Sequence, residues 1–233
     1  MRKLYIGNKN YSSWSMRPWV LMTQAGIPFE EVMVPFGPDF SQPDSAFKKT
    51  VQPMNPAGTV PFLVDGAIVV SDTLAIAEYL AECFPDKALW PVDAAARAQA
   101  RSACAEMHAG FRAIRNHCGM NIEADLATQG QLLLRDRADV RNELARLVQL
   151  WGGLLAQHGG PMLLGDFGIA DAYFAPMASR LKTYALPVPP DIAAYVDRVH
   201  ALPAVEAWMD AARAEHRFVV EDEPYRLQGA QNR

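Results

Sequence analysis

The hydrophobic pattern changes in character near residue 90. Before that point, short apolar runs at residues 3–7 and 29–35 flank a longer stretch at 16–25, which ends at Gly26. Short runs are typical of strands and the longer stretch of a helix. The order predicts two parallel strands joined by a helix, because such crossovers link parallel neighbours. A short helix at 46–51 is expected next.

A hairpin and a third helix complete the first part. Residues 61–64 and 67–70 are apolar and are separated by Asp65-Gly66. That dipeptide favours a type I′ turn, in which both central residues have positive φ. The strands on either side should therefore be antiparallel. A helix follows from about Asp72 and ends before Pro85, because the residue before a proline disfavours helix.

The rest of the chain is alanine-rich and has helical periodicity throughout. We expect an α+β domain (βαβ-ββα) at residues 1–83 and an all-α domain at 94–220, joined by a linker at 86–93. The predicted helices of the second domain cover residues 94–118, 136–157, 169–184, 191–201 and 204–216.

Composition narrows the class of protein. Of the 233 residues, 50% are hydrophobic and 21% charged, with a formal net charge of -4. This allows real hydrophobic cores and gives no basic excess for binding nucleic acid. The N-terminal residues lack the apolar stretch of a secretory signal, and no apolar run is long enough to cross a membrane. We expect a cytoplasmic protein that binds neither nucleic acid nor membrane.

The cysteines and histidines indicate neither a disulfide framework nor a metal site. Cys83, Cys104 and Cys118 form an odd set without a CxxC pair, and the five histidines show no HxxxH or HExxH spacing. Free cysteines usually behave as small hydrophobic residues. We expect structural cysteines in a reducing compartment, and no metal.

The first candidate for a ligand site is the segment 55–61, which ends in Val60-Pro61. A proline at the start of a strand cannot donate to the ladder, so it usually lies at a sheet edge or in a special turn. An exposed edge would let an extended peptide pair with the backbone of Val60, next to Thr59. An edge proline that only prevents aggregation is the alternative.

A second candidate is the start of the helix at Asp72-Thr73. Unpaired N–H groups and the helix dipole at such a position attract a carboxylate, and Asp72 could hold an ammonium group. Asp and Thr are also common capping residues, which is the structural alternative.

The third candidate is a hydroxyl-rich loop that contains Ser12, Ser13 and Ser15 and leads into the first helix. A cysteine thiol with a pKa of about 8.5 needs roughly 2.7 kcal/mol of preferential stabilisation to be half ionised at about pH 6.5. One hydrogen bond to the charged thiolate is worth about 1.5–3 kcal/mol. A serine here could therefore hold a thiolate, or it could simply cap the helix.

Together the three segments resemble the soluble glutathione transferase superfamily over nearly the whole chain. The stretch Ser12-Ser13-Trp14-Ser15-Met16-Arg17 looks most like its serine-type, zeta-related group. The resemblance implies a thioredoxin-like first domain and glutathione as cosubstrate. It implies that Val60-Pro61, with Thr59, pairs with the cysteinyl backbone, and that Asp72 and Thr73 hold the γ-glutamyl end. Ser12 stands where the zeta and tau classes place the catalytic serine.

Some residues depart from that pattern. Ser13 stands where the delta class has its catalytic serine, so both remain candidates, with Ser15 third. Trp14 replaces the zeta cysteine, which weakens an isomerase assignment and leaves no thiol in the loop. Gly168 occupies a helix-cap position usually held by Ser or Thr, so Asp171 should carry more of that capping.

An acceptor pocket is expected between the domains, where pockets commonly form. Its candidate lining residues stand three or four apart in the predicted helix 94–118, so that much of the group can share one face. These residues are Met107, Phe111, Arg112 and Arg115, and His108 belongs to the same run.

The leading hypothesis is a glutathione transferase that conjugates the thiolate to small hydrophobic electrophiles, as in detoxification, and forms a homodimer. A non-catalytic glutathione-binding or regulatory protein of the same fold is one alternative. A glutathione-dependent isomerase of the maleylacetoacetate type is the other.

Overall fold

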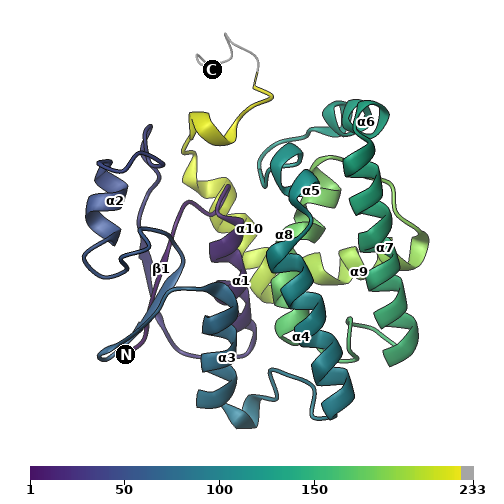
Figure 1. The fold of residues 1–233 in the computed structure, drawn as a ribbon, viewed down its shortest axis with the longest axis horizontal. Coiled ribbons are helices and arrows are strands. Elements are labelled where there is room, and N and C mark those ends of the chain that lie inside the picture. The colour runs from purple at the N-terminus through teal and green to yellow at the C-terminus, as the bar shows by residue number, and fades with distance from the viewer. Residues whose placement is uncertain (227–233) are drawn as a thin grey trace.

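The computed structural model describes residues 1–226 and begins with a small sheet of order β2-β1-β3-β4 (Figure 1). Strand β1 pairs in parallel with β2 and antiparallel with β3, which in turn pairs antiparallel with β4. The strands are β1 (Lys3–Ile6), β2 (Glu30–Met33), β3 (Phe62–Asp65) and β4 (Ile68–Val70). The predicted parallel unit and hairpin are both present.

Helices cover the two faces of this sheet (Figure 1). The helices of this part are α1 (Ser13–Gln24), α2 (Ala46–Val51) and α3 (Thr73–Cys83). Side chains alternate along each strand, so Leu63 joins the main core with α1 and α3 while Phe62 packs with α2 on the other face. This order of elements confirms the predicted α+β fold of the first part.

The hairpin turn differs from the expected type. Asp65 pairs with Ile68, so the loop consists of Gly66 and Ala67, and of these only Gly66 has positive φ, at 60°. A type I′ turn needs positive φ at both positions, so the type I′ prediction was wrong. Glycine first in a two-residue loop is the arrangement of a type II′ turn.

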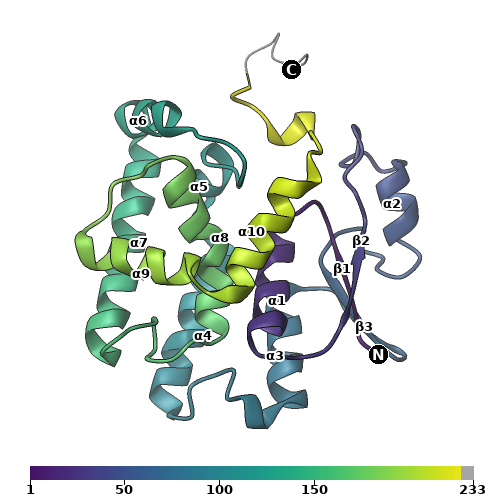
Figure 2. The same cartoon turned by 180° about the vertical axis from the view of Figure 1, so that it is seen from behind.

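The second part is helical, as predicted, and Figure 2 shows α9 and α10 crossing its near side. Its helices are α4 (Ala94–Ala109), α5 (Arg112–His117), α6 (Ala127–Asp136), α7 (Ala138–His158), α8 (Ile169–Thr183), α9 (Pro190–His200) and α10 (Pro203–Glu215). Short 3₁₀ turns occupy η1 (Pro85–Lys87) and η2 (Val220–Asp222).

The expected continuous helix at 94–118 is broken. Gly110 ends α4, and Phe111 adopts left-handed geometry with φ of 52° before α5 begins. Helix α6 was not predicted. It contains Gly130, where a Cβ would lie 1.8 Å from the Tyr184 carbonyl oxygen, so the helix docks there only because no side chain intervenes.

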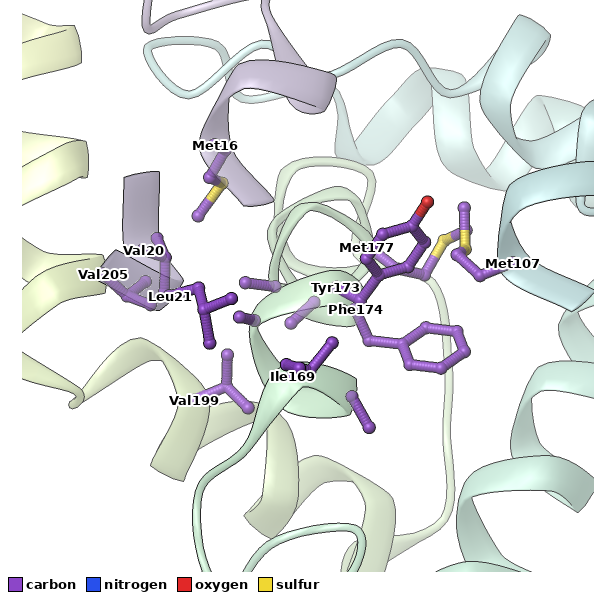
Figure 3. Packing of buried hydrophobic residues seen from close by; sticks show 14 of the residues in the cluster. Met16, Val20, Leu21, Met107, Ile169, Tyr173, Phe174, Met177, Val199 and Val205 are labelled. Atoms are coloured by element: carbon purple, nitrogen blue, oxygen red, sulfur yellow. The ribbon is translucent and has the colours of Figure 1, made fainter. Parts of the chain in front are cut away.

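Helix α8 is the centre of the core, with every residue from Ile169 to Leu181 buried. Figure 3 shows Met16, Val20 and Leu21 of α1 facing α8 on one side. The buried start of α8 is held by Asp171, which accepts from the N–H groups of Gly168 at 3.0 Å and Leu163 at 3.1 Å and from the Tyr195 hydroxyl at 3.0 Å. The expected capping role of Asp171 is confirmed.

Residues 1–226 lack both a membrane-spanning helix and a cluster of metal-ligating side chains. None of their helices combines the length and apolar character needed to cross a membrane. Nor does this part of the chain bring together three or more His, Cys, Asp or Glu side chains in a way that could hold a metal ion.

Candidate active site

A cavity of about 470 Å³ lies where the two parts of the chain meet. The loop into α1, the segment before β3, helix α5 and the C-terminal segment all contribute to its wall. Its lining includes Tyr11, Ser12, Ser13, Trp14, Lys48, Gly58, Thr59, Val60, Arg115, Met120, Arg180 and Asp222. Two of the three predicted ligand segments therefore open into one space.

The three serines at the start of α1 have different surroundings. Ser12 Oγ donates to Ser15 Oγ over 2.7 Å, and Ser15 Oγ also accepts from the Gly7 N–H at 3.1 Å. Ser13 Oγ accepts from Arg180 Nη2 at 3.1 Å. Ser12 and Ser13 line the cavity, whereas Ser15 is fully buried and does not. The Ser13 proton has no acceptor among the residues described and is free to point into the cavity.

Val60 presents free backbone groups to the same cavity. Strand β3 is an inner strand, contrary to the expected edge, but its pairing with β1 starts only at Phe62. Val60 lies before that point, and its N–H and C=O find no hydrogen-bond partner within residues 1–226. The Val60-Pro61 bond is cis. Lys48 Nζ donates to the Gly58 carbonyl at 2.7 Å and holds the preceding turn.

Arginines give this region a positive charge. Arg180 donates to the Cys118 carbonyl at 2.8 Å, and Arg115 donates to the Gly110 carbonyl at 3.1 Å. In the described part of the chain, the hydrogen-bond partners of both are backbone carbonyls or the Ser13 hydroxyl, with no carboxylate. Burial, together with the Arg115 charge, lowers the pKa of Arg180 to about 10, which still leaves it cationic at neutral pH.

Among residues 1–226, one carboxylate lines the cavity wall and balances these charges, that of Asp222 in η2. Burial, reinforced by the charges of Glu221 and Glu223, raises the pKa of Asp222 to about 6. The lining residues Lys48, Arg115 and Arg180 outnumber it, so the cavity carries net positive charge near neutral pH.

Trp14 lines this cavity, and its ring centroid is 5.2 Å from that of His108, whose Nε2 is 3.5 Å from Asp72 at the start of α3. Two guanidinium groups contact the Trp14 ring, with the Arg17 carbon 4.0 Å and the Arg115 carbon 4.8 Å from its centroid. Arg17 is buried and donates to the Tyr173 carbonyl at 2.9 Å. Cation–π contacts of this kind fix the ring in place.

The predicted pair Asp72-Thr73 lies outside the cavity lining, at the exposed N-terminus of α3. Asp72 Oδ1 caps the helix, accepting from the N–H groups of Leu74 at 2.8 Å and Ala75 at 3.2 Å. Thr73 Oγ1 is 2.9 Å from the Tyr173 hydroxyl on α8. Both residues are thus held in fixed positions.

Comparison of the sequence with known protein families identifies the family. Residues 11–83 match the family described as Glutathione S-transferase, N-terminal domain, and residues 94–211 match Glutathione S-transferase, C-terminal domain. The chain belongs to the glutathione S-transferase family. It is a glutathione transferase, and the predicted zeta-related resemblance is confirmed.

Individual relatives agree with the family assignment. Glutathione S-transferase Z1 of Arabidopsis thaliana is 31% identical to the transferase over 72% of this chain and 74% of its own length. Maleylacetoacetate isomerase of Rattus norvegicus is 25% identical over 96% of both chains. A solved glutathione transferase homologue from Burkholderia, with bound glutathione, has a TM-score of 0.64 at 25% identity and covers 92% of this chain and 98% of its own.

The four predicted acceptor residues do not share one helix face, because the helix breaks at Phe111. Met107 and Phe111 are 0% and 4% exposed and belong to the main core. Arg112 is exposed and donates to the Ala109 carbonyl at 3.3 Å. Only Arg115 lines the cavity.

Two cationic residues of this region, Arg180 and Lys48, were not predicted from the sequence. Arg180 was the more detectable, because it is a buried charged residue that follows a mostly apolar stretch of α8. Lys48 gave no such signal, since it stands in a short helix with polar neighbours. Their positions depend on tertiary packing.

Proposed function

We propose that the transferase binds glutathione with its sulfur at Ser12 and Ser13, its cysteinyl backbone paired with Val60 and its γ-glutamyl end at Asp72-Thr73. The free N–H and C=O of Val60 support this, since they offer a strand-like pairing partner. Thr59 and cis-Pro61 flank that position. Glutathione is the cosubstrate, as it is in the family.

The observation that carries the proposal is the hydrogen bond that Arg180 donates to the Ser13 hydroxyl. Ser13 accepts the Arg180 hydrogen bond and keeps its own proton for a thiolate. We propose Ser13 as the thiolate donor, because the Ser12 proton is already directed to Ser15. A hydrogen bond to a charged group contributes about 1.5–3 kcal/mol, and the N-terminus of α1 adds favourable dipole potential.

The ionised sulfur would attack an electrophile held in the rest of the cavity. Positive potential from Lys48, Arg115 and Arg180 supports acceptors that carry a carboxylate over uncharged ones. We propose conjugation of small electrophiles, with anionic ones favoured.

Isomerisation of a maleylacetoacetate-like substrate is the second candidate. The cationic cavity suits a doubly anionic substrate, and relatives include maleylacetoacetate isomerases. Such a reaction would use the same thiolate as a reversible nucleophile. The tryptophan at position 14, where the zeta pattern has cysteine, is the sequence feature that weighs against it.

Arg115→Gln tests the preference for anions. Initial rates should be measured with glutathione and two aryl halides, one neutral and one bearing a carboxylate, and isomerisation of maleylacetoacetate should be followed in parallel. We expect KM for the carboxylated acceptor to rise in Arg115→Gln while KM for the neutral one stays constant. Equal effects on both acceptors would contradict the proposed role. Activity with neither halide, but with maleylacetoacetate, would favour the isomerase.

We also propose that the transferase forms a homodimer in the cytoplasm, with domains at residues 1–83 and 94–220. The apolar side chains of Ile68 and Val69 on edge strand β4 are 50% and 44% exposed and support a partner surface there. The gap between the end of α3 and the start of α4 supports the domain boundary. Sedimentation of wild type and Ile68→Asp would test the dimer, which we expect the substitution to weaken.

A further inference from the structure

A chain of polar side chains connects three helices beside the proposed γ-glutamyl site. Thr73 Oγ1 on α3 lies 2.9 Å from the Tyr173 hydroxyl on α8, which lies 2.7 Å from His108 Nδ1 on α4. The other ring nitrogen of His108, Nε2, is 3.5 Å from Asp72 Oδ2. The chain therefore begins and ends on the two adjacent residues that open α3.

The middle of this chain is shielded from water. Tyr173 is 2% exposed and Thr73 is 4% exposed, whereas the His108 side chain is 37% exposed at the outer end. Figure 3 shows the Tyr173 ring packed beside Met107, with its hydroxyl at the end away from Ile169. Burial raises the pKa of Tyr173 to about 12, so its hydroxyl keeps its proton at neutral pH.

Neutral His108 fixes one direction of hydrogen bonding. The carboxylate of Asp72 selects the tautomer with hydrogen on Nε2, because a lone pair there would face negative charge. Nδ1 then accepts from the Tyr173 hydroxyl, and the Tyr173 oxygen accepts from the Thr73 hydroxyl. In that state the Thr73 proton is already used, and a ligand meets only its oxygen lone pairs.

Protonated His108 reverses that direction. A proton taken from solvent onto Nδ1 makes the ring donate to the Tyr173 oxygen, and Tyr173 then donates to Thr73 Oγ1. The Thr73 proton becomes available to a ligand carboxylate at the N-terminus of α3. No covalent bond to the ligand forms, and only O–H and N–H orientations change.

We infer that His108 acts through Tyr173 and Thr73 as a positioning residue for the γ-glutamyl end of glutathione, and that binding of this end draws a proton onto His108. The inference rests on the proposed γ-glutamyl site at Asp72-Thr73. Binding then favours protonated His108, so affinity should be greater at lower pH.

The charges that face His108 act in opposite directions. Asp72 on α3 favours the protonated ring. Arg17 on α1, which contacts the rings of Trp14 and Tyr173, opposes it, as does Arg115 on α5, which donates to the His108 carbonyl at 3.2 Å. The α-carboxylate of a bound γ-glutamyl group adds one more negative charge, which shifts the balance toward proton uptake.

Calorimetry with S-methylglutathione tests the inference, because this ligand has no thiol to ionise. Binding enthalpy is measured near neutral pH in buffers that differ in ionisation enthalpy, and the slope gives the protons taken up. We expect net uptake by wild type and uptake close to zero in His108→Asn. Tyr173→Phe keeps the imidazole of His108 but removes the hydroxyl that links it to Thr73, and should also abolish uptake. His216→Asn removes an 81% exposed histidine and should behave as wild type.

Affinity measured against pH gives a second readout. Uptake of up to one proton on binding makes wild-type affinity rise by up to about tenfold for each unit by which the pH is lowered. His108→Asn and Tyr173→Phe should lose this dependence. Binding by wild type without proton uptake, or with uptake that both variants retain, would overturn the inference and leave the proposed function intact. Failure of wild type to bind S-methylglutathione would overturn both.

Discussion

Replacing Ser13 by alanine should raise the pKa of the thiol of bound glutathione. In the proposed geometry Ser13 lines the cavity and its proton is directed to no other residue described, while Arg180 donates to its oxygen. Alanine removes the hydroxyl donor and also the acceptor of the Arg180 Nη2 hydrogen bond. At the sulfur itself, the change is the loss of one hydrogen bond.

The size of the effect follows from the energy of that bond. A hydrogen bond to a charged group is worth about 1.5–3 kcal/mol, and about 1.36 kcal/mol corresponds to one pKa unit. The thiol pKa should rise by about one to two units. Below the thiol pKa, kcat/KM should fall by about 10- to 100-fold, whereas above about pH 9 wild type and variant should converge, because the thiol is then ionised without help.

The assay is kcat/KM for conjugation of a neutral aryl halide as a function of pH, which reports the thiol pKa of the binary complex. Ser12→Ala should shift that pKa less than Ser13→Ala does. Ser102→Ala is the control, because Ser102 is exposed on α4 and its hydroxyl donates to the Ala98 carbonyl of its own helix. If Ser12→Ala raised the thiol pKa and Ser13→Ala did not, the assignment of the donor would be refuted.

Three further predictions concern stability. Gly130→Ala should lower the free energy of unfolding by about 1–3 kcal/mol, because the added Cβ meets the Tyr184 carbonyl. Gly153→Ala, whose Cβ would have nothing within 4 Å, should be neutral or stabilising. Urea unfolding of both variants separates the effect of crowding from that of helix propensity. Asp171→Ala should cost at least about 2 kcal/mol, since it leaves buried donors without a partner, and an unchanged melting temperature would contradict this. Burial, aided by Lys182, lowers the pKa of His200 to about 4. The unfolded chain then binds the proton first, so stability should fall as pH drops below about 6.5, by about 2 kcal/mol at pH 5, and His200→Gln should flatten that part of the profile.

Elements with strong local signals could be predicted from the sequence. The strands of the sheet alternate inward and outward side chains, and Asp72 and Pro85 mark the limits of α3 well. Helix boundaries were predicted wrongly where a glycine is compatible with either the end or the interior of a helix. Gly110 ends a helix in mid-pattern, whereas Gly130 lies inside one because a neighbouring carbonyl fills the space of its side chain.

The candidate site was predicted only as far as local motifs reach. The serine loop and Val60 are recognisable because each is a short contiguous segment. Arg180 reaches Ser13 across 167 positions of sequence, and His108 reaches Thr73 only through Tyr173 of another helix. Such contacts depend on how α8 packs against α1 and α4, which no periodicity encodes.

A crystal structure of the transferase with bound glutathione would test the central claim most directly. We expect the sulfur within hydrogen-bond distance of Ser13 Oγ, and the cysteinyl N–H and C=O paired with those of Val60. A glutathione molecule bound elsewhere, or bound with Val60 unpaired and the sulfur away from both Ser12 and Ser13, would contradict the proposed site.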